Sequence, residues 1–141
     1  MKSFPDHIRT NSTFSKLAFD DLLFAEYKCP IKESKVPVWS KDNYLVYVLS
    51  GKKIWSSGDV TYELKEGDSI FVAKGAHYLE QIMDKEFCLL IFFFPDEFLE
   101  EVLEEANYKR KSSTEEIPKF IPIDVNEPLK LFFLSMKSFF A

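Results

Sequence analysis

Short apolar segments separated by turn residues fill the chain between residues 44 and 94. Residues 60–64 alternate between apolar and polar side chains, which is the period of a strand with one face in water. Turn residues such as Gly51, Gly67 and Gly75 divide the segments. This spacing is typical of antiparallel sandwiches and barrels, and it predicts about five or six consecutive strands.

The predicted strands are short, and the last of them is apolar throughout. They cover residues 44–49, 54–55, 60–64, 69–73, 78–82 and 87–94. A strand without polar side chains must be covered on both faces, so residues 87–94 should lie near the centre of the barrel. The 15 phenylalanines of the chain also favour a sheet-rich core, because aromatic side chains suit pleated surfaces.

After Pro95 the apolar period becomes that of a helix. Apolar residues recur at helical spacing over residues 98–106, with glutamates on the other side that read as a solvated face. Two prolines make residues 117–122 an extended stretch. Asn126 is a good N-cap for a final helix, and the missing C-cap at Ala141 favours a chain that is the front portion of a longer protein.

Charge and composition limit the partners of the chain. Its net charge is −5, and 18 Lys and Arg residues are scattered among 23 acidic residues, so we do not expect it to bind nucleic acid itself. Cys29 and Cys88 form no Cys-x-x-Cys pair, and no stretch resembles a signal peptide. The longest apolar run has 8 residues, against the ~20 that a membrane-spanning helix needs. We therefore expect one cytoplasmic domain without a membrane partner.

Residues 39–98 resemble a cupin barrel, and in particular the N-terminal part of AraC-family transcription regulators in the branch that includes activators of type III secretion. The resemblance is carried by residues 47–51, 66–77 and 87–98, and its most specific part is a barrel strand, then Phe93-Phe94-Pro95-Asp96, then a helix. It implies a mainly β fold: a cupin-like double-stranded β-helix, or jelly-roll barrel, followed by two α-helices. The barrel with its N-terminal extension would cover residues 1–94, and the helical appendage residues 95–141.

The resemblance also implies a regulatory domain and not an enzyme. In the family the barrel binds a small-molecule effector or a regulatory protein, the following helices dimerise, and a C-terminal helix-turn-helix domain binds promoter DNA. The 141 residues leave no room for that last domain, so DNA binding is expected only through a part absent from this chain. The residues expected at the homodimer contact are Leu129, Phe132, Phe133, Met136, Phe139 and Phe140.

The apolar face of the final helix has a second interpretation. It could pack on the outer face of the chain's own barrel, because leaving it in water would forgo on the order of 10 kcal/mol. Association of two proteins costs ~4–15 kcal/mol. The energy of burial therefore permits dimerisation without requiring it.

The residues at the metal-binding positions of cupins do not suit a metal. By position, Tyr44 replaces the expected glutamate, and the two histidines are replaced by Val38 and Ser40, or by Pro37 and Trp39. His77 comes one residue before the fourth ligand position, so in the register of the motif it is predicted to face away from the barrel interior, whereas a looser turn would let it face inward. No nucleophile pattern is present either, and we expect no metal, no cofactor and no catalytic residue.

The barrel interior is expected to be filled or narrow, because small barrels are often packed by side chains. If a ligand pocket exists, we expect Trp39, Tyr44, Trp55 and Tyr78 near its rim, with His77 as a further candidate. The alternative to a regulatory domain is a stand-alone small cupin protein that binds a small molecule or a metal.

Overall fold

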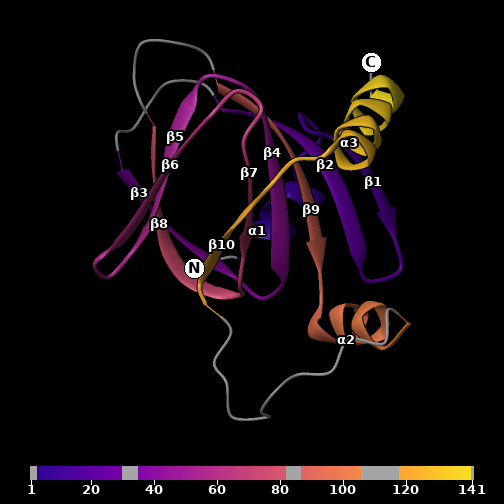
Figure 1. Cartoon of the computed structure of the whole chain (residues 1–141), viewed down its shortest axis with the longest axis horizontal. Helices are drawn as coiled ribbons and strands as arrows, with labels where there is room; N and C mark the ends of the chain where they lie inside the picture. Colours follow the sequence, from indigo (N-terminus) through magenta and orange to yellow (C-terminus); the bar gives the residue numbers. More distant parts are fainter. Residues whose placement is uncertain (1–2, 30–34, 82–86, 106–117, 141) are drawn as a thin grey trace.

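Two antiparallel β-sheets face each other and enclose the core (Figure 1). The computed structural model describes residues 3–29, 35–81, 87–105 and 118–140. Within these residues the larger sheet has six strands in the order β1-β2-β9-β4-β7-β10, and the smaller sheet has four in the order β3-β8-β5-β6. The mainly β fold predicted from the sequence is therefore confirmed.

The strands of the larger sheet are β1 (Ser15–Phe19), β2 (Leu22–Cys29), β9 (Phe87–Phe94), β4 (Asn43–Ser50), β7 (Ser69–Val72) and β10 (Phe120–Ile123). Those of the smaller sheet are β3 (Lys35–Ser40), β8 (Gly75–Gln81), β5 (Lys52–Ser57) and β6 (Val60–Lys65). The helices are α1 (Phe4–Thr10), α2 (Asp96–Glu105) and α3 (Glu127–Phe140).

Strand β9 lies inside the larger sheet, between β2 and β4. Leu89, Ile91 and Phe93 point into the core between the sheets. On the other face, Leu90 belongs to a second buried cluster, and Phe92 contacts Phe98 of α2. Both faces of β9 are thus covered, which is the reason that its sequence is apolar throughout.

The elements before residue 44 were not predicted from the sequence. Strand β1 is exposed along most of its length, so its side chains carry no alternation that a pattern could detect. Strand β3 contains Pro37, which disfavours a strand except at a sheet edge, and β3 is indeed an edge strand of the smaller sheet. At the other end of the chain, the predicted extended stretch forms β10, which pairs with β7.

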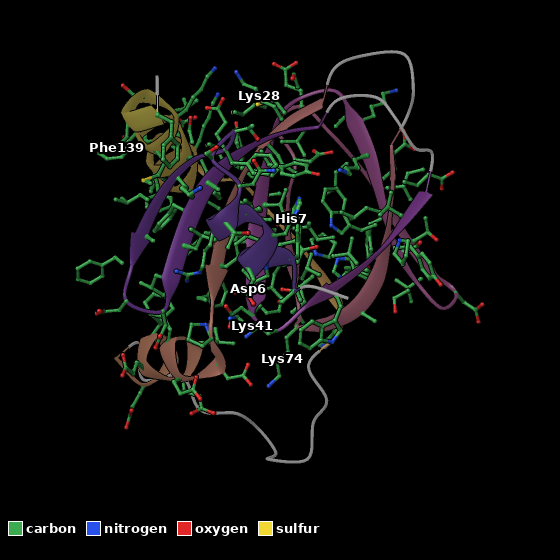
Figure 2. All side chains as sticks on the ribbon, turned by 180° about the vertical axis from the view of Figure 1, so that it is seen from behind. Asp6, His7, Lys28, Lys41, Lys74 and Phe139 are labelled. Atoms are coloured by element: carbon green, nitrogen blue, oxygen red, sulfur yellow. The ribbon has the colours of Figure 1, made fainter. Side chains whose placement is uncertain are left out.

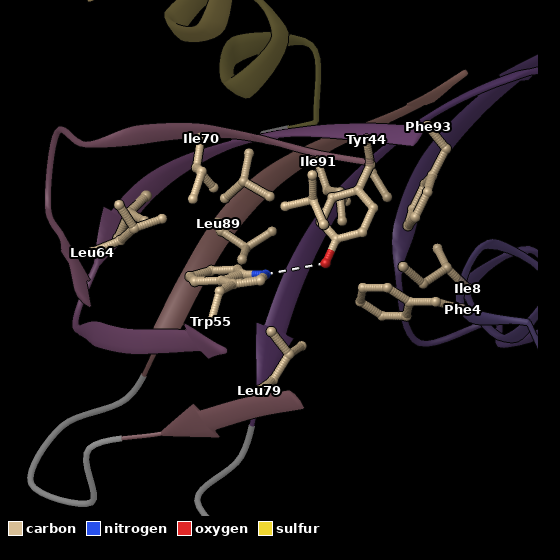
Figure 3. Packing of buried hydrophobic residues seen from close by; sticks show 14 of the residues in the cluster. Phe4, Ile8, Tyr44, Trp55, Leu64, Ile70, Leu79, Leu89, Ile91 and Phe93 are labelled. Atoms are coloured by element: carbon tan, nitrogen blue, oxygen red, sulfur yellow. Dashed lines mark hydrogen bonds between the residues drawn. The ribbon is translucent and has the colours of Figure 1, made fainter. Parts of the chain in front are cut away.

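The space between the sheets is filled by side chains from both of them and from α1 (Figure 3). The core cluster consists of Phe4, Ile8, Leu23, Ala25, Tyr44, Val46, Val48, Trp55, Leu64, Ile70, Val72, Leu79, Leu89, Ile91, Phe93 and Phe120. Three of the 15 phenylalanines, Phe4, Phe93 and Phe120, belong to it.

Side-chain bonds attach the start of helix α2 to the barrel. The Asn43 side-chain amide donates a hydrogen bond to Asp96 at 2.7 Å, and its oxygen accepts one from the Lys74 backbone at 2.9 Å. The Lys74 ammonium pairs with the same Asp96 carboxylate. These bonds hold the first turn of α2 to the start of β4 and to the turn before β8.

No helix among the described residues is long and apolar enough to cross a membrane.

Candidate functional site

The final helix α3 is apolar on two sides, and one side packs on the larger sheet. Phe133 is 2% exposed and forms a buried cluster with Tyr47 and Leu90. Its ring stacks on that of Tyr47, with centroids 4.7 Å apart. Leu129, Met136 and Phe140 are partly buried against the same cluster. Four of the six residues expected at a dimer contact therefore face the chain's own barrel.

The other side of α3 is not covered by the described residues of the chain. Leu131 is 60% exposed, Phe132 41%, Leu134 38% and Phe139 62%. Phe132 touches the edge of Phe24 on β2, whereas Phe139 lies on the side of α3 away from the sheets (Figure 2). Leu131 and Leu134 were not among the predicted contact residues, because residues 129–134 are apolar except for Lys130 and the pattern does not single out one face there.

Inside the barrel, three side chains form a chain of hydrogen bonds across the two sheets. The indole N–H of Trp55 on β5 donates to the Tyr44 hydroxyl of β4 at 3.0 Å (Figure 3). The same hydroxyl lies 2.6 Å from Nε2 of His77 on β8. All three residues are at most 3% exposed. The chain of bonds links the larger sheet to the smaller one, and a buried lysine, Lys53, lies on the same face of β5 as Trp55, with its ammonium 5.1 Å from the centre of the Tyr27 ring.

Burial determines the charge of the histidine in this chain of bonds. The Tyr44 hydroxyl accepts the Trp55 N–H, and the direction of its bond with Nε2 of His77 depends on which nitrogen of the neutral ring carries the proton. Nδ1 has no hydrogen-bond partner among the described residues. Burial, and after it the charge of Lys119, lower the pKa of His77 to about 4, and the backbone of Gly75 offsets only part of this. The ring is therefore neutral at pH 7, and burial also raises the pKa of Tyr44.

The predicted outward orientation of His77 is wrong. Along β8, Ala76 and Tyr78 face outward while His77 and Leu79 are buried. The strand begins directly at Gly75, whose φ of +119° lets the chain turn within a single residue. One residue in the length of that turn reverses the direction of every following side chain, and the count from the cupin motif assumed a longer turn.

The side chains at the cupin metal position do not fit a metal ion. His77 is the one nitrogen ligand that the described residues bring to Tyr44, and its Nε2 is engaged with the Tyr44 hydroxyl. No group of three or more His, Cys, Asp or Glu residues that could bind a metal occurs in the described part of the chain. Metal cupins bind their ion with three or four converging ligands.

The predicted pocket residues separate into two groups. Tyr44 and Trp55 are fully buried on inward-facing positions of β4 and β5, so their expected place at a pocket rim is wrong. Trp39 and Tyr78 are 43% and 46% exposed, and they lie on an open groove of about 670 Å³. The groove is lined by residues 37–39, 57–58 and 76–78. Whether any of the five residues binds a ligand stays a prediction.

Comparison with solved structures gives the fold. A crystal structure of apo ToxT from Vibrio cholerae is similar with a TM-score of 0.60 at 10% sequence identity, over 86% of this chain and 48% of that chain. The cupin domain of Cnp3 from Schizosaccharomyces pombe is similar with a TM-score of 0.51 at 19% identity, over 63% of this chain and 64% of that chain. The predicted cupin-like architecture is thus confirmed. The chain spans about half the length of ToxT and under two thirds of the Cnp3 chain.

Comparison of sequences gives the family. No curated protein matches the chain, but the family model described as "ExsA N-terminal regulatory domain" matches residues 43–141. The match runs from the start of β4 through the barrel, α2 and α3 to the last residue, which is well over half of the chain. It includes both the buried hydrogen-bond chain and the two-sided final helix. The chain belongs to the family of ExsA N-terminal regulatory domains, the N-terminal domains of AraC-type transcription regulators.

Proposed function

We propose that this regulatory domain is not a catalyst, that it pairs with a second copy of itself through α3, and that its barrel receives a signal from an effector or a regulatory protein. Promoter DNA would be bound by a separate helix-turn-helix domain of the same regulator, since the net charge of −5 gives this domain no attraction for DNA. A regulator of this kind acts in the cytoplasm, where the DNA is.

The exposed side of α3 is the observation that carries the pairing. Phe132 and Phe139 are seven residues apart, so they lie one above the other on one side of the helix after two turns. They remain 41% and 62% exposed although the opposite side of the helix is buried on the barrel. Exposed Ser135 and Ser138 lie beside them and would let a second helix approach closely.

The energy of such a contact suits a reversible pair. Leu131, Phe132, Leu134 and Phe139 are each about half exposed, and burying them on both copies would contribute on the order of 10 kcal/mol. That gain is close to the ~4–15 kcal/mol that association costs. A two-fold axis brings the same side chains of each copy together, so every residue of the patch is buried once on each copy and contributes twice to the burial energy. Pairing that depends on protein concentration follows from this balance.

Light scattering of the purified chain tests this proposal. We expect twice the mass of one chain at high micromolar concentration, and the mass of one chain for the double variant Phe132→Glu/Phe139→Glu, in which two charges would face their own copies. Phe19→Glu is the matched control, because Phe19 is 70% exposed on β1 and lies outside α3. This control should still pair.

Two results would contradict the pairing. One is a wild-type chain that stays a monomer at high micromolar concentration. The other is a double variant that pairs as well as the control, which would place the contact elsewhere on the surface.

A further inference from the structure

Helix α1 covers the opening between the two sheets and places apolar side chains inside the barrel. It lies across the gap between β2 of the larger sheet and β3 of the smaller one, near the centre of the rear view (Figure 2). Ile8 is fully buried and Phe4 is 9% exposed. Both belong to the core cluster, where they lie beside Tyr44 and Phe93 (Figure 3).

The Phe4 ring occupies a cage of aromatic side chains. It meets the rings of Tyr27, Tyr44 and Phe93 edge-on, with centroid distances of 5.8, 5.7 and 5.4 Å. Edge-to-face contact is the favourable arrangement for aromatic pairs. The barrel therefore contains a site shaped for a flat aromatic ring, and the ring that fills it comes from a short helix at the edge of the fold.

Helix α1 is joined to the rest of the fold by side-chain hydrogen bonds, among them bonds from the Lys16 ammonium of β1 to the Ile8 and Asn11 carbonyls at 3.2 and 2.8 Å. Its own backbone bonds are internal, as from the His7 amide to the Ser3 carbonyl at 2.9 Å. The Ser3 hydroxyl accepts a bond from the Lys41 backbone at 2.9 Å, and the Lys41 ammonium pairs with Asp6 at 2.8 Å, with both side chains more than a third exposed. Removal of α1 would break no hydrogen bond of a strand pair, and a helix of 7 residues is not stable alone.

A hollow beside α1 leads from the surface to this cage. Its volume is about 320 Å³, and it is lined by Phe4 and His7 of α1 together with Tyr27, Val38, Trp39 and Leu79. The Phe4 ring forms part of its wall. A molecule can therefore reach the edge of the cage while α1 is still in place.

We propose that α1 is a detachable plug, and that a small aromatic ligand competes with Phe4 for the cage of Tyr27, Tyr44 and Phe93. The ligand class follows from the Phe4 ring already present: one flat apolar ring, nearly perpendicular to three aromatic neighbours. The inference does not depend on pairing through α3, because the cage and the exposed side of α3 lie on opposite faces of the larger sheet.

Competition with Phe4 would lower the apparent affinity of the ligand for the cage. If the cage is open only in the fraction of molecules whose plug is detached, the apparent dissociation constant exceeds the intrinsic one by the inverse of that fraction. Shortening the plug should tighten binding, and fixing the plug in place should abolish it. A ligand that binds elsewhere on the surface would respond to neither change.

The test uses the full chain and p-cresol as the probe, with binding measured by calorimetry. Phe4→Ala empties the cage and should bind p-cresol at least ~10-fold more tightly than the wild type. Phe19→Ala, the same truncation at a position of β1 that is 70% exposed and lies outside both the cage and α3, should leave the affinity unchanged. A Phe4→Ala chain that is folded by circular dichroism but binds no more tightly than the wild type would overturn the proposal.

A reversible lock decides the question if Phe4→Ala fails to fold. Ser3→Cys and Lys41→Cys introduce a pair where the Ser3 hydroxyl and the Lys41 backbone are now 2.9 Å apart, with Cys29→Ser and Cys88→Ser to prevent other disulfides. We expect p-cresol to bind at least ~10-fold more weakly when the pair is oxidised than after its reduction. Equal affinity of the oxidised and reduced forms would show that α1 is a fixed part of the core.

Discussion

The buried hydrogen bonds from Trp55 through Tyr44 to His77 make Tyr44 a costly residue to replace. One hydroxyl serves two partners, at 3.0 Å and 2.6 Å. A buried polar group that loses its partner costs about 1–3 kcal/mol, which is more than a typical hydrogen bond contributes. Loss of the Tyr44 hydroxyl would therefore also destabilise the fold by leaving its two partners, Trp55 and His77, without this hydrogen bond.

Tyr44→Phe should destabilise the chain by about 2–5 kcal/mol, because the Trp55 N–H and His77 Nε2 would both remain buried without this partner. Urea denaturation at pH 7 measures the loss. The double variant Tyr44→Phe/His77→Leu is the matched control, and it should lose less than the sum of the two single variants, since it removes both members of one bond. Strict additivity would show that the two side chains are not coupled.

The histidine should make stability depend on pH. Its pKa is about 4 in the folded chain, against 6.5 for an ordinary histidine. The unfolded chain therefore binds more protons between these values, and stability is lost as the pH falls from 6.5 to 4. The loss due to His77 amounts to about 3 kcal/mol, and His77→Leu should have a correspondingly smaller pH dependence over that range. An NMR signal of His77 that titrates with a midpoint near 6.5 would contradict this.

Tyr44 and His77 could be identified from their positions in the sequence, but the direction in which the His77 side chain points could not be predicted. Tyr44 and His77 were recognised as the residues near the ligand positions of metal cupins. Ala76 and Tyr78 are no more polar than His77 and Leu79, so β8 has no clear alternation between polar and apolar side chains. The direction of His77 depends on the length of the turn at Gly75, which only the structure provides.

At the scale of elements, helix α3 combines a buried and an exposed apolar surface. The side with Phe133 and Tyr47 attaches the helix to the barrel, and the side with Phe132 and Phe139 is exposed. Both interpretations of the apolar helix, packing on the barrel and contact with a second copy, can therefore hold at once, with different residues in each.

Truncation of the two sides of α3 should have different effects. Phe133→Ala should cost about 3–5 kcal/mol, because it leaves a cavity against Tyr47. Phe139→Ala should change the stability of the single chain by less than ~0.5 kcal/mol, since the side chain is mostly in water. Thermal unfolding at low protein concentration compares the two. Equal losses would mean that α3 does not pack as the structure shows.

The elements that the sequence revealed are those with a buried face or a clear start. Strand β9 was predicted with its observed bounds because every residue is apolar, and α2 because it follows Pro95 with helical spacing. Helix α1 was missed because it is short and its apolar residues, Phe4 and Ile8, are only two. Strands β2 and β3 pair with β9 and β8, far away in the chain, and local patterns do not report such pairing. Among the described residues strand β1 pairs only with its neighbour β2, but it is exposed along most of its length.

At the scale of the whole molecule, strand β4 joins the barrel interior to helix α3. Tyr44 faces the aromatic cage and the buried hydrogen bonds, whereas Tyr47, on the other face of the same strand, supports Phe133 of α3. A change inside the barrel that moves β4 would also move the support of α3. The family match begins at residue 43 and so contains this strand together with both of its faces.

Fusion of the chain to a DNA-binding domain that binds its operator only as a pair tests the central claim, that this is the assembly domain of a regulator. The fusion should shift operator DNA in a gel at a protein concentration where the DNA-binding domain alone does not, and Phe132→Glu/Phe139→Glu should abolish the shift while Phe19→Glu preserves it. A wild-type fusion that binds no better than the DNA-binding domain alone, or a double variant that binds as well as the wild type, would contradict the account.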